Sequence, residues 1–294
     1  MKSSDAIGII GGSGLYQIDG LSRTYWKSLA SSFGKPSDQG FHGSLDGARA
    51  VFLPRHGRGH RIPPSAVNYR ANIEGLKKAG CRDILSISAV GSLKEALPPG
   101  TFVIVDQFID RTFAREKSFF GPGLVAHVSM ARPVCHRLGD HLEAAAKKLK
   151  IPVVRGGTYL VMEGPQFSTL AESTLYRSWG CDVIGMTNMP EAKLAREAEL
   201  CYASVSMVTD FDCWHPEHDH VSVDAIVKTL HENADRARAL VREVLPRIAS
   251  DSHAANCSCR SALETAVLTP MDSRDPRMLR KLGVVAGRVL KKKT

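Results

Sequence analysis

The 294-residue chain lacks any apolar run of about 18 residues, the length that a membrane-spanning helix needs. Its first five residues lead into an apolar segment without the hydrophobic centre of a signal peptide. We therefore exclude a transmembrane helix and an export signal, and we expect a protein of the cytoplasm. Hydrophobic residues make up 43% of the sequence, so the chain can bury a sizeable core in one large domain or two small ones.

The sequence also lacks cysteines in the spacing of a disulfide framework or a zinc ribbon. Its seven cysteines are scattered, most of them in apolar stretches, which is typical of reduced, buried thiols. Cys257 and Cys259 stand out, but they are too close for half of a zinc ribbon, and no second pair follows. A redox pair, a local disulfide and an ordinary loop all fit this spacing, and we favour the loop.

A second group that could suggest a metal consists of His215, His218 and His220, close to Asp212. Pro216 interrupts the group, and the spacing is irregular. We expect a solvated, mobile loop over a cleft instead. No metal site is therefore predicted.

A complete nucleotide-binding fingerprint is missing as well. The apolar segment 6–10 runs into Gly11-Gly12-Ser13-Gly14, a turn rich in backbone donors that suits a phosphate. Gln17 stands where a dinucleotide motif has its third glycine, and no Gly-Lys-Ser/Thr follows as in a P-loop. The turn alone is weak support for anion binding.

A good part of the net charge of +9 comes from basic residues near the end of the chain, between residues 274 and 293. Few aromatic residues accompany them, so a solvated terminal helix is favoured over a nucleic-acid-binding surface. A basic protein also suits an anionic small substrate.

Apolar, β-branched runs alternate with amphipathic patterns, which predicts an α/β fold. Strands are expected at residues 6–10, 50–53, 83–87, 102–105, 183–186 and 203–208, and helices at 68–79, 138–149, 170–179 and 224–245, the last ended by Pro246. Residues 1–250 form one domain in this interpretation. Residues 251–294 form an extension that ends in a basic helix and packs on the same domain.

Polar residues follow several predicted strands, where open α/β sheets place their sites. Arg55 and His56 suit an oxyanion, although a solvated basic loop would look the same. Ser88 and Ala89 offer a hydroxyl and an amide near a glycine, or mark a plain strand end. Phe167 follows a Gly-Pro turn and either stacks on a base or anchors the core.

Taken together and in order, the motifs make the chain similar to the 5'-methylthioadenosine phosphorylases, within the trimeric purine nucleoside phosphorylase superfamily. The resemblance covers about residues 6–248 and rests on segments 10–14, 54–57, 64–72, 163–167 and 186–191 and on the segment around Asp210. It implies a single domain with a mixed central β-sheet flanked by helices, of the nucleoside phosphorylase type. It also implies a homotrimer or a dimer of trimers, and no cofactor besides inorganic phosphate as co-substrate.

The resemblance assigns site residues position by position. The positions that match phosphate ligands are Ser13, Arg55, His56, Ser88, Ala89 and Thr187. Those that match the nucleoside site are Phe167 and Met186 beside the base and ribose, Val223, Ile226 and Val227 along the 5' end, and Asp210 and Asp212 at the purine. His127 matches a residue that reaches into the neighbouring subunit's site.

The chemistry of the base agrees with Asp210 and Asp212. Adenine offers a donor at N6 and an acceptor at N7, which suit a carboxyl group, whereas a 6-oxopurine offers two acceptors. Similar 6-oxopurine enzymes have asparagine at this place. Val223 replaces the histidine of enzymes for ordinary nucleosides and favours a methylthio group, although nearby His220 leaves the ordinary nucleoside open.

The expected reaction is phosphorolysis of S-methyl-5'-thioadenosine to adenine and 5-methylthioribose 1-phosphate, a pentosyl transfer that serves purine and methionine salvage. Asp210 is expected to be the general acid, with a pKa raised by burial, while Asp212 orients the base. The alternatives are a phosphorylase of methylthioinosine or 6-oxopurine nucleosides and, in another class, a basic nucleic-acid-binding protein on the same fold.

Overall fold

The structure, a computed structural model, describes residues 5–12, 14–215 and 223–290, with side chains from residue 229 onward in the last range. Ser13, His218 and His220 therefore lie outside the described residues, as do the side chains of Val223, Ile226 and Val227. No helix in the described ranges is both long and apolar enough to cross a bilayer.

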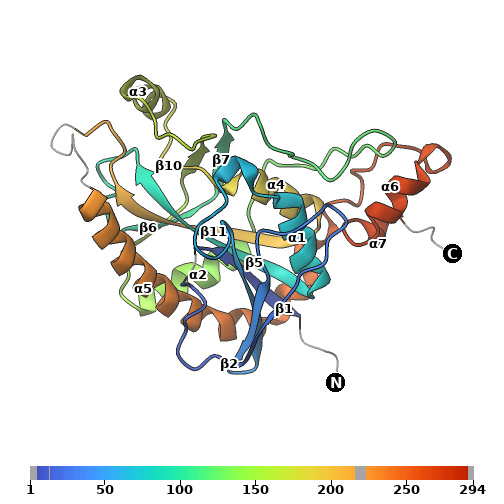
Figure 1. Ribbon diagram of the computed structural model, residues 1–294, viewed down its shortest axis with the longest axis horizontal. Helices are drawn as coiled ribbons and strands as arrows, with labels where there is room; N and C mark the ends of the chain where they lie inside the picture. The colour runs from blue at the N-terminus through green and yellow to red at the C-terminus, as the bar shows by residue number, and fades with distance from the viewer. Residues whose placement is uncertain (1–4, 13, 216–222, 291–294) are drawn as a thin grey trace.

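A single mixed β-sheet runs through the described part of the chain (Figure 1). Its strands are β1 (Ala6–Gly11), β2 (Ser22–Lys27), β3 (Gly40–Leu45), β4 (Ala48–Pro54), β5 (Cys81–Ser92), β6 (Phe102–Val105), β7 (Gln107–Asp110), β8 (Val153–Arg155), β9 (Thr158–Val161), β10 (Val183–Gly185) and β11 (Cys201–Asp210). They lie in the order β2-β3-β4-β1-β5-β10-β9-β7, and β11 pairs with β5 and with β6, which in turn pairs with β8.

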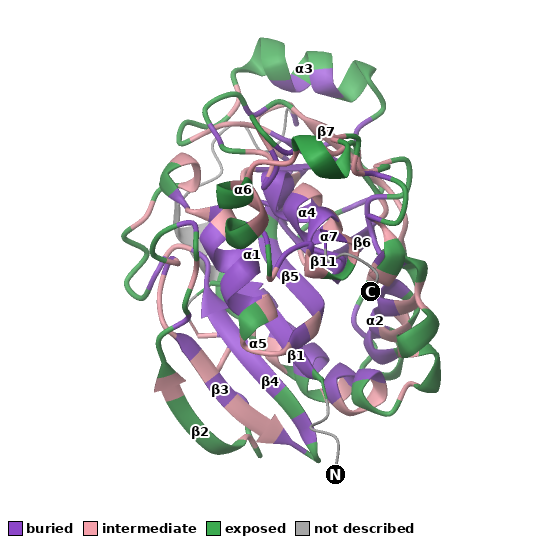
Figure 2. Cartoon of the chain, turned by 90° about the vertical axis from the view of Figure 1, so that its right-hand side faces the viewer, coloured by how far each residue is buried: buried purple, intermediate pink, exposed green. Residues whose placement is uncertain are grey.

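Four central strands, β4, β1, β5 and β11, run parallel to one another, so their carboxyl ends meet at one edge of the sheet. Pro54 lies opposite Gly11, and Asp210 lies opposite Gly91 after an irregularity in β11. These strands are buried along most of their length, whereas the edge strand β2 is exposed (Figure 2). The burial explains their continuous apolar sequences.

Helices cover both faces of the sheet. They are α1 (Tyr69–Lys78), α2 (His136–Lys148), α3 (Leu170–Ser178), α4 (Asn188–Glu197), α5 (Val223–Ala249), α6 (Pro276–Lys281) and α7 (Gly287–Leu290), with short 3-10 turns η1 (Pro64–Ala66), η3 (Ser252–Asn256), η4 (Ser258–Ser261) and η5 (Met271–Ser273). Side chains of α1 and α4 share one core, and those of α2 and α5 share the other. Helix α3 stands apart from both layers (Figure 1).

Every strand and helix expected within residues 1–250 is present, with ends that differ by a few residues. The prediction that Pro246 ends the long helix is wrong, because α5 continues to Ala249. Proline only removes one donor there, and the buried Leu245 and Ile248 hold the last turn against the core. Strands β2, β3, β7, β8 and β9 and helix α4 were not expected.

The C-terminal extension is part of the same globule, but it is not one basic helix. It ends in two short helices, α6 and α7, separated by a turn. Leu282 and Val285 are fully buried in the core that α1 and α4 share. Lys77 donates to the Val285 carbonyl at 2.7 Å, and Arg288 pairs with Glu199 at 2.7 Å. Apolar burial, together with these polar contacts, explains why the extension does not project as a solvated helix.

Candidate active site

Most of the described site residues lie at one edge of the sheet, where its central strands end. Arg55 and His56 follow β4, Ser88 and Ala89 belong to the second half of β5, and Asp210 ends β11. Thr187 follows β10, which runs antiparallel to β5. Continuing the same pairing along the two segments brings Thr187 next to Ser88. An open cleft of about 1020 Å³ between Gln17 and α5 lies elsewhere, and none of the predicted site residues lines it.

Arg55 is buried and held by a dense set of protein contacts. Its guanidinium pairs with Glu191 through Nε at 2.9 Å and Nη2 at 3.2 Å. It also donates to the Ile87 carbonyl at 3.1 Å and to Ser86 Oγ at 2.7 Å. Most of its donors are therefore used inside the protein. Arg55 fixes the end of β4 against β5 and α4 and has little left to offer a ligand directly.

Glu191 is the centre of this network, although nothing in its motif distinguishes it from its neighbours in the sequence. Its carboxylate also accepts from Ser86 at 2.6 Å and from the Tyr202 hydroxyl at 2.8 Å. The charge pair with Arg55 is almost completely excluded from solvent. Buried charges persist when they are paired and hydrogen-bonded in this way. The network therefore links the end of β4, β5, α4 and β11 rigidly to one another.

His56 follows Arg55 in the chain, and one of its ring nitrogens already has a hydrogen-bond partner. Its Nδ1 lies 2.7 Å from the Ile62 carbonyl, which can only accept, so Nδ1 carries the proton in the neutral ring. The ring stacks on His60 with centroids 4.4 Å apart. Burial, together with the neighbouring Arg55, lowers the pKa of His56 to about 4. At neutral pH the ring is thus uncharged, and Nε2 is an acceptor.

Ser88 and Thr187 bring two hydroxyl groups to the same place. Ser88 Oγ and the Tyr159 hydroxyl are buried, and neither makes a hydrogen bond of ordinary length within the described part of the chain. Tyr159 faces both Ser88 and Thr187. A buried hydroxyl without a partner costs about 1–3 kcal/mol. An oxyanion bound here would give Ser88 an acceptor.

Asp210 and Asp212 form a pair of carboxyl groups at the end of β11. Asp210 accepts from Thr209 Oγ1 at 2.7 Å and from the Asp212 amide at 2.8 Å. Asp212 has a positive φ of 54°, a conformation that aspartate tolerates better than most residues. Burial raises the pKa of Asp210 above its ordinary value, and burial followed by the charge of Asp210 raises that of Asp212. Both shifts favour a carboxyl group that holds a proton.

Phe167 and Met186, the residues predicted to flank the base, lie on two other segments. Cys213, next to Asp212, donates to the Ser168 carbonyl at 3.4 Å, which ties the end of β11 to the segment before α3. Phe167 in that segment is 77% exposed, so the alternative that it anchors the core is wrong. Met186 is half-buried and packs against Gly164, where a Cβ would stand 2.5 Å from its sulfur.

A second polar network, which the sequence did not suggest, supports these segments. The Glu163 carboxylate accepts from Ser65, from the Phe113 amide at 2.5 Å and from Arg115 Nε at 3.1 Å. Although burial opposes it, these hydrogen bonds lower the pKa of Glu163 to about 2. Arg115 also donates to the Met186 carbonyl at 2.6 Å. The pair thus fastens the loop around Ser65 and the Glu163 and Met186 segments to one another.

Two histidines named in the sequence analysis have partners other than those considered there. His215 lies 3.1 Å from Glu95 and stacks on Phe211, which gives it partners other than a metal. His127 is exposed, and its amide donates to the Ala266 carbonyl of the C-terminal extension. That extension lies at the opposite end of the molecule from α3 (Figure 1). His127 therefore does not meet Asp210 within one chain.

Comparison with known proteins agrees with this architecture. A sequence profile of the Phosphorylase superfamily matches residues 6–246. The chain is 64% identical over 284 residues to a Rhodospirillum rubrum protein named S-methyl-5'-thioadenosine phosphorylase, with 97% of each chain covered. The chain belongs to the S-methyl-5'-thioadenosine phosphorylase family. A Cereibacter sphaeroides member is 58% identical over 285 residues, with 97% of this chain and 98% of that one covered.

Solved structures of this phosphorylase family share the fold. A methylthioadenosine phosphorylase from an antarctic soil metagenomic library has a TM-score of 0.91 and 46% identity, covering 97% of this chain and 99% of the other. The Schistosoma mansoni methylthioadenosine phosphorylase in complex with adenine has a TM-score of 0.83 and 38% identity, covering 92% and 99%. The expected α/β fold with a mixed central sheet is confirmed.

Proposed function

We propose that the chain splits S-methyl-5'-thioadenosine with inorganic phosphate into adenine and 5-methylthioribose 1-phosphate. One observation carries the proposal: two half-buried carboxyl groups, Asp210 at the end of β11 and Asp212 just after it, lie at the same edge of the sheet as the hydroxyl and imidazole groups of Ser88, Thr187 and His56. The first group suits a 6-aminopurine and the second an oxyanion. Membership in the family supports the same substrate.

Phosphate is held, in this proposal, mainly by neutral groups. The hydroxyl groups of Ser88 and Thr187 donate hydrogen bonds to it, and the amide of Ala89 adds a further donor. Ser13, which lies outside the described residues, is assigned one more hydroxyl donor. His56 Nε2 accepts from the O–H that hydrogen phosphate retains at neutral pH, because its Nδ1–H is committed to Ile62. Arg55 supplies positive potential and holds the strand end, since Glu191 already occupies most of its donors.

The reaction breaks the bond between C1' of the ribose and N9 of the base. A phosphate oxygen attacks C1' while the bonding electron pair leaves with adenine, through an oxocarbenium-like transition state. Asp210 donates a proton or a hydrogen bond to N7, which makes adenine a better leaving group. Its raised pKa supports this role. Asp212 orients the base, and the exposed ring of Phe167 is available to stack on it. No metal or organic cofactor takes part.

The 5' end of the nucleoside is assigned to Val223, Ile226 and Val227 at the start of α5, an apolar wall for the methylthio group. We further propose that the active unit is a homotrimer or a dimer of trimers, because His127 is exposed and remote from Asp210 in its own chain. The setting we propose is purine and methionine salvage in the cytoplasm.

The decisive experiment measures cleavage of four nucleosides with and without phosphate. Methylthioadenosine, adenosine, methylthioinosine and inosine are compared by kcat/KM, and products are identified by chromatography. We expect strictly phosphate-dependent cleavage, with methylthioadenosine at least tenfold better than either 6-oxopurine. A preference for inosine or methylthioinosine would refute the argument from the carboxylate pair. Cleavage that proceeds equally without phosphate would refute phosphorolysis.

A further inference from the structure

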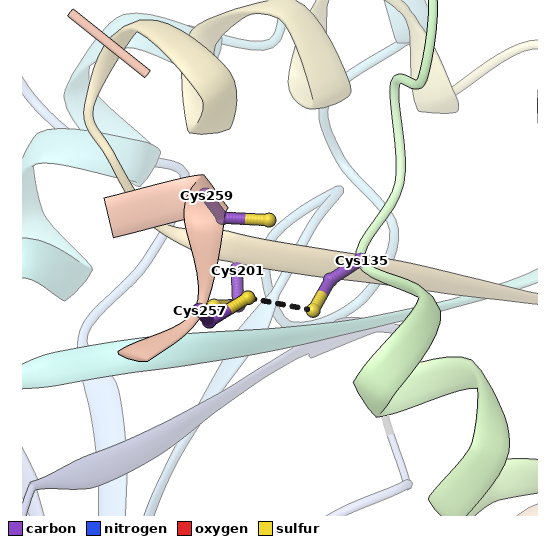
Figure 3. Close-up of side chains that lie close together, drawn as sticks. All are labelled: Cys135, Cys201, Cys257 and Cys259. Carbon is purple, nitrogen blue, oxygen red and sulfur yellow. Dashed lines mark hydrogen bonds between the residues drawn. The ribbon is translucent and has the colours of Figure 1, made fainter. Parts of the chain in front are cut away.

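Four cysteines from three distant segments of the chain converge on one point, remote from the strand ends of the active site. Cys135 immediately precedes α2 and Cys201 begins β11, whereas Cys257 precedes η4 and Cys259 lies within it, in the C-terminal extension. Figure 3 shows their side chains directed toward one another. All four are free thiols, and three of them are buried. The sequence favoured an ordinary loop at Cys257 and Cys259, and the structure shows instead that they complete this cluster.

The spacing of the sulfur atoms matches a tetrahedral metal centre. Every pair of Sγ atoms in the cluster lies within 4.8 Å, and those of Cys135 and Cys257 are 3.6 Å apart. A zinc ion with Zn–S bonds of about 2.3 Å places its four sulfurs about 3.8 Å apart. Small rotamer changes therefore suffice to bring all four into contact with one ion. Among the described residues, no other group of histidine, cysteine and acidic side chains has such geometry.

Two groups that stabilise negative charge border the cluster. Cys135 occupies the N-cap of α2, where the helix dipole stabilises negative charge. The guanidinium of Arg137 hydrogen-bonds to the Cys201 sulfur, and it also pairs with Asp83 and, at 3.0 Å, with Asp251.

We propose that Cys135, Cys201, Cys257 and Cys259 bind one structural zinc ion that clamps the C-terminal extension onto α2 and β11. Binding replaces the four S–H bonds by four Zn–S bonds and releases the protons to solvent, so no oxidant or reductant is needed. Four thiolate ligands leave no open position, which is typical of a structural zinc site. Arg137 is then the outer hydrogen-bonding partner of one ligand, Cys201.

An entry path for the ion is visible beside the cluster. A surface cleft of about 520 Å³ is lined by Cys135, Cys257 and Cys259, together with His136 and Arg137. Three of the four proposed ligands can thus be reached from one cleft before the site closes. The same cleft gives chelators and thiol reagents access to the cluster.

The first test is the metal content of the full-length protein purified under reducing conditions without chelator, by mass spectrometry of the elements. We expect about one zinc per chain in the wild type and at least a tenfold loss in Cys257→Ser and Cys135→Ser. Cys181→Ala removes a buried thiol outside the cluster and should retain zinc. Iron in place of zinc, or equal zinc in all variants, would overturn the proposal.

The second test needs no variant and therefore does not depend on whether the substitutions fold. Metal-free wild-type protein is titrated with zinc alone while its thiols are counted with a colorimetric reagent. Four thiols should become protected per zinc bound, and cobalt in its place should give the intense visible absorption of a tetrahedral thiolate complex. If zinc protects none of them, or if the four cysteines prove to be joined in disulfides after reducing purification, the site does not exist.

Discussion

The carboxyl group of Asp210 lies directly against the backbone of Gly91, on the neighbouring strand. A Cβ placed on Gly91 would stand 3.0 Å from Asp210 Oδ1 and 3.4 Å from the Cβ of Asp212. The absence of a side chain at position 91 is therefore a condition for the position of both carboxyl groups. A methyl group there would displace the pair without removing any of its atoms.

From this contact we predict that Gly91→Ala lowers kcat/KM about 10- to 100-fold, because a displacement of less than 1 Å is enough to misalign a proton donor. Circular dichroism and thermal unfolding should show a folded protein. Gly287→Ala, at a glycine with free space around its Cα, is the matched control and should keep full activity. A folded Gly91→Ala variant with wild-type kinetics would show that the packing against Asp210 does not matter.

The proposed acid role of Asp210 predicts a specific pH dependence. The group must be protonated to act, so its contribution is complete below its folded-state pKa and is lost as pH rises through it. Asp210→Asn cannot transfer a proton, and we expect kcat/KM to fall about 10²- to 10⁴-fold and the falling limb of the pH–rate profile to disappear. The amide can also donate to a 6-oxopurine, so the ratio of methylthioinosine to methylthioadenosine cleavage should rise.

Asp272→Asn is the control for that experiment, because Asp272 is an exposed carboxylate in η5. It should leave both the rate and the pH profile unchanged. If Asp210→Asn retained the falling limb at high pH, another group would have to be the acid.

The hydrogen-bonding pattern of His56 predicts an effect confined to phosphate. Asparagine at this position can still donate to the Ile62 carbonyl, but it lacks the acceptor at Nε2. We expect His56→Asn to raise KM for phosphate about tenfold, which corresponds to the loss of one hydrogen bond, with little change in KM for the nucleoside. His253→Asn is the matched control, since His253 is an exposed histidine in η3. A larger effect on nucleoside than on phosphate would contradict the assignment.

The Glu163 network predicts a stability that depends on pH. The folded-state pKa of Glu163 is about 2, below its ordinary value of 4.5. Its contribution is therefore complete above pH 4.5 and is lost as pH falls from there toward 2. Glu163→Gln should lower the free energy of unfolding by about 1–3 kcal/mol at neutral pH, and the two proteins should converge on acidification.

Denaturant unfolding at neutral pH and at about pH 3 measures this difference. Glu116→Gln provides the comparison, because Glu116 is 75% exposed and its contact with Arg70 is at the surface. A constant gap between wild type and Glu163→Gln across this range would mean that the carboxylate charge is not what stabilises the loops.

The parts of the fold that the sequence predicted are those with a strong local signal. Strands β1, β4, β5 and β11 are apolar along most of their length because both faces of the sheet are covered, and α1 and α2 repeat apolar residues at helical spacing. The edge strand β2 has mostly exposed, polar residues, and α4 contains Pro190 in its first turn. Neither segment has a pattern that distinguishes it from a loop.

The candidate site divides in the same way. Asp210, His56 and Thr187 are recognisable because their motifs follow predicted strands. The partner of Arg55 is not, because Glu191 lies 136 residues away and only the packing of α4 against the sheet brings the two together. The same holds for the cysteines, since Cys135 and Cys257 are separated by 122 residues. Contacts of this range depend on topology, which no local pattern contains.

The two hydrogen bonds from Lys77 bear on how the chain can be shortened. Its ammonium group donates to the Ala198 carbonyl and to the Val285 carbonyl, so one of its two acceptors belongs to the C-terminal extension. A polypeptide that stopped at residue 250 would leave this cation with an unmet hydrogen bond and would uncover the apolar surface beneath Leu282. Truncation would thus expose part of the hydrophobic core to solvent. Affinity tags or fusion partners should therefore be attached after the extension rather than in its place.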